Sequence, residues 1–133
     1  MIMSDYPPFR VIIAGTRSFN DYELLRDSCN NLLSEKQRTH TVVVISGTAR
    51  GADQIGERYA RERGFQLRRF PAKWEQYGKS AGHIRNAKMA DNADALIAFW
   101  DGESKGTKNM IDNARRKGLE VRVVLYKKTN ENI

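Results

Sequence analysis

Short apolar segments alternate along the chain with segments in which apolar residues recur every three or four positions. Continuous apolar runs and apolar–polar alternation are both typical of strands, and they predict strands at 9–15, 41–47, 65–70, 94–100 and 120–126. Helical spacing predicts helices that begin near residues 20, 51, 80 and 108. Strict alternation of strand and helix predicts an α/β fold, a doubly wound parallel sheet of about five strands with helices on both faces.

Boundary residues refine these predictions. Asn20 with Glu23 forms a candidate capping box at the start of the first helix. Gly64 and Gly118 are natural stops for two later helices, because glycine readily adopts the left-handed conformation that ends a helix. The strands around 10–14 and 94–99 are uniformly apolar, so we expect them to be central neighbours in the sheet. The alternating segment 65–70 is expected nearer an edge.

The 133 residues are an ordinary length for a single domain. We expect an N-terminal extension at 1–8, one folded domain at 9–126 and a disordered tail at 127–133. The longest connection, residues 71–79, is long for a strand-to-helix loop, and such loops are often functional.

Composition limits the possible functions. The net charge of +7 favours an anionic partner, although a solvated basic surface explains it equally well. One cysteine, Cys29, allows neither an intramolecular disulfide nor a cysteine-based zinc site, and its place on an apolar helix face predicts a core residue. His40 and His83 lack metal-ligand spacing. No signal peptide or membrane-spanning run is recognisable, so we expect a cytoplasmic protein without a membrane partner, metal or cofactor.

Candidate chemistry gathers where parallel strands end, because ligands of open α/β sheets bind beyond the carboxyl ends of the strands. Four segments should meet at that edge: 14–21, 46–53, 71–86 and 100–107. Each carries glycine and a basic residue, and the cations Arg17, Arg50, Arg85 and Lys105 are predicted to converge on one rim.

Two of these segments share a layout. "GTARG" (47–51) and "GESKG" (102–106) place glycines four residues apart just before a helix. Glycine permits close approach of a ligand, and a helix start offers amide groups and partial positive charge, so both loops are candidate phosphate sites. The alternative is that the glycines only make turns; two matched loops favour phosphate. The candidate ligand-binding residues are Gly15, Thr16, Arg17, Ser46, Gly47, Thr48, Arg50, Gly51, Asp53, Arg85, Asn86, Gly102, Ser104, Lys105, Gly106 and Thr107.

Other motifs are absent, and some residues keep two interpretations. The sequence has no phosphate-binding P-loop motif and no G-x-G-x-x-G after the first strand, which argues against a P-loop NTPase and against the usual mode of NAD binding. Trp74, Tyr77 and Trp100 flank the loops and either stack on a nucleobase or cover the sheet. Asp53 is either a ribose contact or a carboxylate favoured at a helix start, and we favour the second role.

Three stretches in order, "VIIAGTRSF", "SGTARGAD" and "AGHIRNAKMADNADALIAFWDGESKGTKNMI", resemble the SLOG superfamily of Rossmann-like proteins. That group joins the Smf/DprA DNA-processing proteins to the LOG phosphoribohydrolases, and the YspA/YpsA-like branch is the most similar. The resemblance covers about 9–126. It implies a Rossmann-like domain that binds a nucleotide or nucleotide-derived ligand at the strand ends.

The resemblance also bears on catalysis. LOG enzymes cleave the N-glycosidic bond of nucleoside 5′-monophosphates with an arginine from an "RKxxxM"-like helix and a glutamate from "PGGxGTxxE". Arg85 in "RNAKM" matches the arginine, and Gly106 with Thr107 matches the "GT". Met110 stands where the glutamate is expected, and Asp101-Gly102 replaces Pro-Gly-Gly.

Hydrolysis through an oxocarbenium-like state needs a carboxylate near the sugar. Arg85 and Glu103 are therefore the catalytic candidates if the protein is an enzyme, with Asp101 or Asp53 as other sources of a carboxylate. Without the glutamate, we expect binding without efficient hydrolysis.

These observations predict a sensor or carrier of a nucleoside monophosphate, ADP-ribose or an NAD-like ligand. The alternatives are a phosphoribohydrolase or other N-glycosidase, and DprA-like nucleic-acid binding. Because relatives in the superfamily form dimers or larger assemblies, we also expect a homo-oligomer.

Overall fold

The computed structural model describes residues 6–127. The predicted N-terminal extension and tail therefore fall largely outside the described residues. The described chain forms, in order, β1 (Pro8–Gly15), α1 (Tyr22–Lys36), β2 (Thr41–Ser46), α2 (Ala52–Arg63), β3 (Gln66–Arg69), α3 (Trp74–Tyr77), the 3₁₀ turn η2 (Gly78–Ser80), α4 (Ala81–Asp91), β4 (Ala95–Trp100), α5 (Lys105–Arg116) and β5 (Glu120–Leu125).

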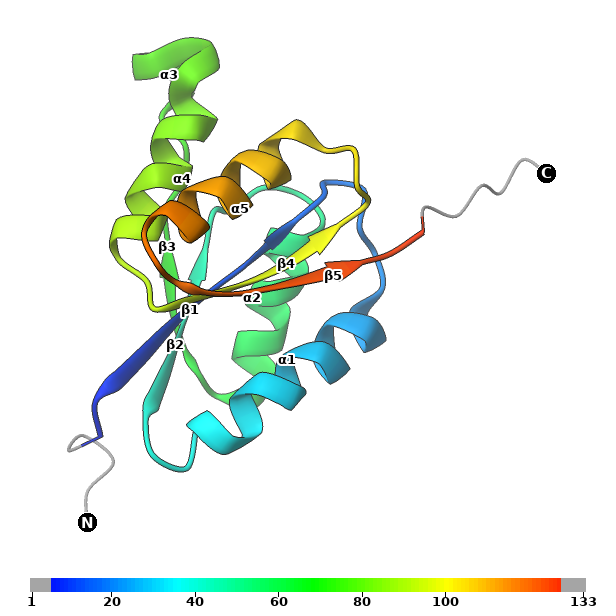
Figure 1. The fold of residues 1–133 in the computed structure, drawn as a ribbon, viewed down its shortest axis with the longest axis vertical. Coiled ribbons are helices and arrows are strands. Elements are labelled where there is room, and N and C mark those ends of the chain that lie inside the picture. The colour runs from blue at the N-terminus through cyan, green and yellow to red at the C-terminus, as the bar shows by residue number, and fades with distance from the viewer. Residues whose placement is uncertain (1–5, 128–133) are drawn as a thin grey trace.

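The strands form one parallel sheet in the order β3-β2-β1-β4-β5 (Figure 1). β1 lies at the centre and pairs with β4, with Val11 opposite Ala95, which confirms the predicted central neighbours. β3 is an edge strand, as its alternating sequence predicts. The chain builds outward from β1 to β3 and then crosses to β4, so the switch point lies between β1 and β4.

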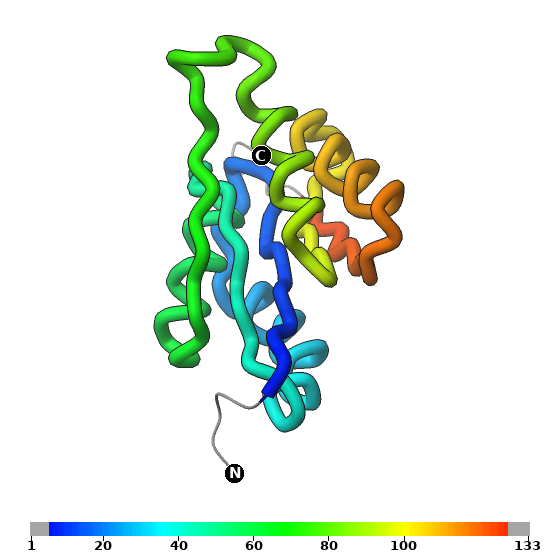
Figure 2. The backbone as a smooth tube through the Cα atoms, turned by 90° about the vertical axis from the view of Figure 1, so that its left-hand side faces the viewer, coloured from blue at the N-terminus to red at the C-terminus, as the bar shows by residue number. Residues whose placement is uncertain are grey.

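Two helical layers cover the sheet. α1 and α2 lie on one face, and α4 and α5 lie on the other (Figures 1 and 2). Successive residues of β1 point to opposite faces: Val11 and Ile13 belong to the core under α1 and α2, and Ile12 to the core under α4 and α5. The α/β class with helices on both faces is therefore confirmed.

Cys29 is fully buried on the inner face of α1, in agreement with its predicted place in the core. Burial raises the pKa of its thiol to about 12. The thiol is therefore protonated at neutral pH and is a poor nucleophile.

The start of α1 differs from the prediction. The capping residue is Asp21, one residue after Asn20, and its Oδ1 accepts a hydrogen bond from the amide of Leu24 at 3.0 Å. Asp21 lies three residues before that amide, which is the spacing at which a side chain can cap the first turn. The predicted Asn20–Glu23 box is therefore wrong by one residue, and Glu23 lies in the first turn, where the helix dipole favours a carboxylate.

The long connection 71–79 is not a plain loop. It contains α3 and the start of η2, and Figure 2 shows it extending beyond the end of the sheet before it returns into α4. None of the helices within residues 6–127 is long and apolar enough to cross a membrane.

Candidate functional site

The carboxyl ends of the central strands border a cavity of about 210 Å³, here called the central cleft. Eight of the predicted site residues line it: Gly15, Arg17, Asp53, Arg85, Asn86, Ser104, Gly106 and Thr107. Ala49 belongs to the first glycine loop and Gly106 to the second, so the structure brings both loops to the same edge of the sheet, beside Arg85.

Two further cavities adjoin the central cleft, and Arg17 lines all three. One, about 340 Å³, is lined by three further predicted residues of the first loop: Gly47, Thr48 and Arg50. The other, about 460 Å³ and wide open, is lined by Thr16, Asp101 and Glu103 among others. The predicted residues Ser46, Gly51, Gly102 and Lys105 line none of these three cavities.

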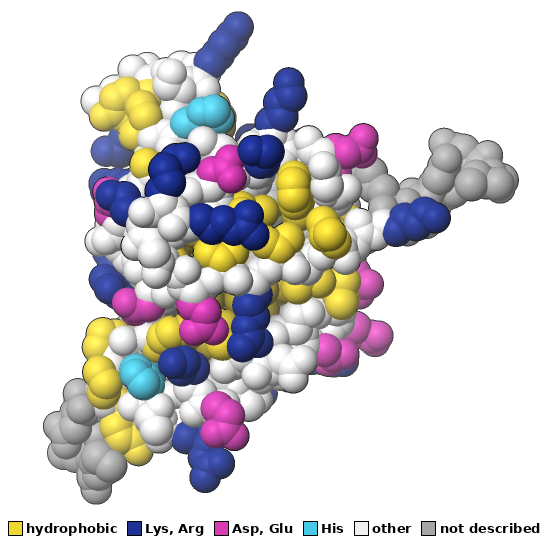
Figure 3. Space-filling model, in the orientation of Figure 1, with side chains coloured by type: hydrophobic (Ala, Val, Ile, Leu, Met, Phe, Trp, Pro, Cys, Tyr) yellow, Lys and Arg dark blue, Asp and Glu magenta, His cyan; other side chains and the backbone are white. Residues whose placement is uncertain are grey.

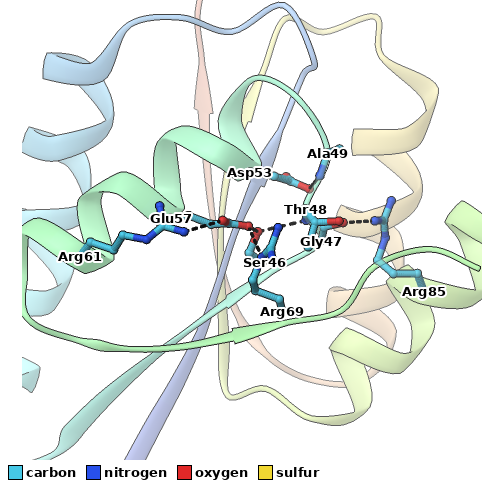
Figure 4. Close-up of polar contacts among 9 residues, drawn as sticks. All are labelled: Ser46, Gly47, Thr48, Ala49, Asp53, Glu57, Arg61, Arg69 and Arg85. Carbon is cyan, nitrogen blue, oxygen red and sulfur yellow. Dashed lines mark hydrogen bonds and ion pairs between the residues drawn. The ribbon is translucent and has the colours of Figure 1, made fainter.

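Arg85 reaches from α4 to the first glycine loop (Figure 4). Its Nη1 donates a hydrogen bond to the carbonyl oxygen of Gly47, and its Nε donates to Asn86 Oδ1 at 3.0 Å. A Cβ atom at Gly47 would lie 2.9 Å from Arg85 Nη1 and 2.8 Å from Asp53 Oδ2. A side chain at position 47 would therefore displace the guanidinium of Arg85 or the carboxylate of Asp53.

Asp53 lies in the first turn of α2, where its carboxylate accepts a hydrogen bond from the amide of Ala49 at 3.1 Å. Burial raises the pKa of this carboxyl to about 6, although the Ala49 amide and the charge of Arg85 act in the opposite direction. This contact ties Asp53 to the first glycine loop, and the first turn of α2 is a position where the helix dipole favours a carboxylate. A ribose contact remains a prediction.

Arg85 is partly buried, and burial lowers the pKa of its guanidinium while the charge of Asp53 raises it. The group remains cationic because a free guanidinium titrates far above neutral pH. A buried cation with incomplete compensation is a strong attractor for an anion.

A buried network that sequence reasoning missed supports the first loop (Figure 4). Ser46 Oγ donates to Glu57 Oε2 at 2.6 Å and accepts from the amide of Thr48 at 3.0 Å. Glu57 is 3% exposed and also forms ion pairs with Arg61 of α2 and Arg69 of β3. Ser46 therefore anchors the loop. Its hydroxyl group already donates one hydrogen bond and accepts another within the protein.

Thr48, which this network holds, has a φ of +67°, a conformation that is rare for residues other than glycine. Gly51, at the end of the same loop, has a φ of +77°, and a Cβ there would lie 2.4 Å from the carbonyl oxygens of Thr16 and Arg17. The loop is therefore closed by its own contacts, with Gly51 packed against the loop after β1.

The second glycine loop also satisfies many of its own amides. Asp101 Oδ1 accepts from the amides of Glu103 and Ser104, each at 2.9 Å. Ser104 Oγ accepts from the amide and from the hydroxyl of Thr107, at 3.3 and 3.0 Å. The amides of Lys105 and Gly106 lie in the first turn of α5, where amide groups have no partner within the helix. The loop thus offers fewer donors than its layout predicted.

The other predicted residues fall into different places. Asn86 is buried and joins α4 to α5 through Asn109 Oδ1 at 3.0 Å. Trp74 is half exposed and lines the central cleft, whereas the ring nitrogen of Trp100 donates to the carbonyl oxygen of Ser104. Lys79 and His83 also line the central cleft, and both belong to the segment 71–86 that was expected at this edge of the sheet.

Of the catalytic candidates, Arg85 lines the central cleft and Glu103 lines the open cavity next to it. Met110, at the position of the LOG glutamate, is buried and lines the central cleft. Within residues 6–127, Asp53 is the one carboxylate that lines this cleft. The described residues contain no group of three histidine, cysteine or acidic side chains placed to hold a metal ion.

Comparison with known proteins gives a family, one relative in sequence and two solved structures. Residues 9–77 match the sequence profile of a family described as YspA, cpYpsA-related SLOG family. The chain is 39% identical over 121 residues to the gene 61 protein of Mycobacterium phage D29, covering 84% of this chain and 93% of that protein.

Two solved structures share the fold. DNA processing protein A (DprA) from Streptococcus pneumoniae matches 93% of this chain with a TM-score of 0.71 and 17% identity. TM1055, a structural genomics target, matches 85% of this chain and 72% of its own, with a TM-score of 0.61 and 22% identity. The chain corresponds to 52% of the DprA chain, and at these identities the likeness concerns the fold.

Proposed function

Because the chain belongs to the YspA, cpYpsA-related SLOG family, we propose that it binds a nucleotide or nucleotide-derived ligand in the central cleft. The observation that carries the proposal is that Arg85 and the start of α5 line one cleft at the switch point of the sheet. Switch points of open α/β sheets are where nucleotides bind, and helix starts favour phosphate.

The charges of the cleft support an anionic ligand. Arg17, Lys79 and Arg85 line it, whereas Asp53 is the one acidic residue that does so within residues 6–127. The amides of Lys105 and Gly106 add donors at the positive end of the α5 dipole. We propose that a phosphate group lies between Arg85 and this helix start, with Arg17 closing the site from the loop after β1.

We further propose that the protein acts as a sensor or carrier and does not turn its ligand over efficiently. Met110 has no ionisable group with which to stabilise a developing positive charge. Asp53 is held by the Ala49 amide and its raised pKa keeps part of its population protonated near pH 6. Base release from nucleoside monophosphates, measured with purified protein, tests this. Robust turnover that Arg85→Ala abolishes would contradict it and favour the phosphoribohydrolase alternative.

Nucleic-acid binding is the second candidate, and the net charge of +7 favours it. Figure 3 shows basic side chains distributed over the face drawn, with acidic side chains between them. Affinity for an oligonucleotide that falls steeply as salt increases would favour this candidate. Saturable binding of a mononucleotide with weak salt dependence would favour the small-ligand site.

A thermal-shift screen with nucleoside monophosphates, ADP-ribose and NAD identifies the ligand class. A ligand present at about 100 times its Kd adds about 2.7 kcal/mol to the free energy of unfolding, and the melting temperature rises accordingly. Ribose 5-phosphate and inorganic phosphate serve as controls for the contribution of the base. No shift with any of the nucleotides would contradict the proposed function.

A further inference from the structure

A cavity of about 280 Å³ lies outside the central cleft, between the end of β3 and α4. We call it the side groove. Its apolar lining comes from Phe70 and Pro71 after β3, Tyr77 of α3, and Ala81 and Ile84 of α4. The nucleotide-binding proposal makes no use of these residues, so the side groove needs its own explanation.

Within residues 6–127, the apolar lining of the side groove includes three exposed side chains, Pro71, Tyr77 and Ile84, whereas Phe70 is partly exposed and Ala81 is buried. α4 packs against α5, and its residues Ala81, Ile84 and Lys88 lie on a common face that is turned toward β3. Tyr77 and Ile84 are each 42% exposed. They are two of the few large hydrophobic side chains exposed within residues 6–127, and apolar side chains gathered in a hollow mark an interaction site.

The side groove is also strongly basic. Arg68, Arg69, Lys73, Arg85 and Lys88 line it, and no acidic residue of the described chain does. Arg69 is paired with Glu57, but Lys73 and Lys88 form no ion pair within residues 6–127. Arg68 lies over the ring of Phe70 at 5.3 Å. The hollow therefore combines an apolar floor with uncompensated positive charge at its rim.

The apolar floor and the basic rim together argue against three possible occupants of the side groove. A second copy of the chain would bring like charges together, which opposes association. A small-molecule site has a few polar groups fixed in place, whereas Lys73 and Lys88 are exposed and have no ion-pair partner within residues 6–127 to fix them. Single-stranded nucleic acid stacks its bases on a series of exposed rings, and Tyr77 is the one half-exposed ring in the lining described.

We propose that the side groove docks an acidic segment of a partner protein, with one apolar side chain in the hollow and carboxylates facing the basic rim. The volume suits one large apolar side chain as an anchor, and anchors of this kind dominate the energy of such contacts. β3 pairs with β2 on one side and is an edge of the sheet, so its other side can accept an extended peptide backbone. The proposal does not depend on nucleotide binding in the central cleft.

Fluorescence anisotropy with a labelled peptide, Asp-Glu-Asp-Phe-Asp-Glu-Asp, tests the proposal. We expect saturable binding to the wild type and at least about tenfold weaker binding to Ile84→Ser and to Lys88→Glu, which remove an apolar contact and reverse a rim charge. The matched control is Arg115→Glu, an equal charge change on an exposed residue of α5 outside the groove. It should bind within about twofold of the wild type at physiological salt, where the Debye length is short. Melting temperatures confirm that the variants are folded.

Three results would overturn the proposal. The first is no saturable binding at peptide concentrations up to about 1 mM, which corresponds to a binding free energy weaker than about 4 kcal/mol. The second is equal binding of a peptide with serine in place of phenylalanine, because attraction would then be charge alone. The third is tighter binding of an oligothymidine that Tyr77→Ala abolishes, which would make the groove a nucleic-acid surface.

Discussion

Asp53 brings a carboxyl group to the wall of the central cleft while remaining only 5% exposed. Its pKa is about 6 in the folded protein and 3.8 in an unperturbed aspartate, mainly because burial disfavours the charged form. The folded protein therefore binds the proton more tightly than the unfolded chain does. The free energy of unfolding that depends on Asp53 decreases as pH rises from about 4 to about 6 and stays low above that range.

Asp53→Asn should consequently stabilise the protein at pH 7, by on the order of 2–3 kcal/mol at most, because a neutral amide avoids the burial of a charge. The amide oxygen can still accept the Ala49 hydrogen bond. Urea denaturation of both proteins at pH 4 and pH 7 measures this, and the difference should shrink at pH 4. A variant less stable than the wild type at pH 7 would show that attraction to Arg85 outweighs burial.

Arg85→Ala tests the cation that the proposed phosphate would meet. Hydrogen bonds to charged groups contribute about 1.5–3 kcal/mol, so nucleotide affinity should fall by that amount. Arg115→Ala is the matched control, because Arg115 is an exposed arginine of α5 that lines none of the cavities at the strand ends. Titration calorimetry with the nucleotide that gives the largest thermal shift gives both affinities. Equal affinities of the wild type and Arg85→Ala for the nucleotide would show that Arg85 does not contribute to binding.

At the scale of elements, the amino ends of β1 and β4 are joined by an ion pair. Arg10 donates Nε and Nη2 to the two carboxylate oxygens of Asp94, at 3.1 and 3.0 Å, and its backbone amide donates to Oδ2 at 2.8 Å. These hydrogen bonds lower the pKa of Asp94. The stabilisation is therefore present above the ordinary range of an aspartate and is lost as pH falls through the lowered pKa.

Asp94→Ala should destabilise the protein by about 1 kcal/mol at pH 7, since both side chains are more than one-third exposed and solvent screens the pair. Urea denaturation gives the value, and the difference from wild type should diminish toward pH 3. A destabilisation that stays constant with pH would mean that the ionised pair contributes nothing measurable.

The elements themselves could be predicted from the sequence, and the contents of the loops could not. The uniformly apolar strands predicted both their central position and their pairing, because a strand buried on both faces leaves no polar positions. The shared spacing of "GTARG" and "GESKG" predicted two alike phosphate loops. Asp53, Ser46 and Asp101 bind amides of those loops instead, and such contacts depend on side-chain geometry that spacing does not determine.

For the whole molecule, the strand order placed the two loops together at one edge, which is a consequence of parallel topology. Glu57 escaped prediction because a buried carboxylate with two arginine partners looks, in sequence, like an exposed helix residue. The side groove also escaped prediction. Its apolar and basic residues come from two segments, 68–73 at the end of β3 and beyond it, and 77–88 in and before α4. Only the folded chain brings these two segments together.

The predicted homo-oligomer remains a whole-molecule prediction. Light scattering at high protein concentration should give a mass that is a multiple of the chain mass, as the resemblance to the SLOG superfamily implies. A monomer mass across the concentration range would contradict it. An oligomer that forms equally well in Ile84→Ser would place the interface away from the side groove.

The central claim, that a nucleotide binds against the start of α5, is tested most directly at Gly106. This glycine lines the central cleft, and a Cβ there would meet no atom within 4 Å, so Gly106→Val can fold while its side chain occupies the space proposed for phosphate. The measurement is a calorimetric titration of AMP, ADP-ribose and NAD into the wild type and Gly106→Val. We predict saturable binding of at least one of these ligands to the wild type and none to the variant, at unchanged melting temperature. Equal binding to both proteins, or no binding to the wild type, would contradict the account.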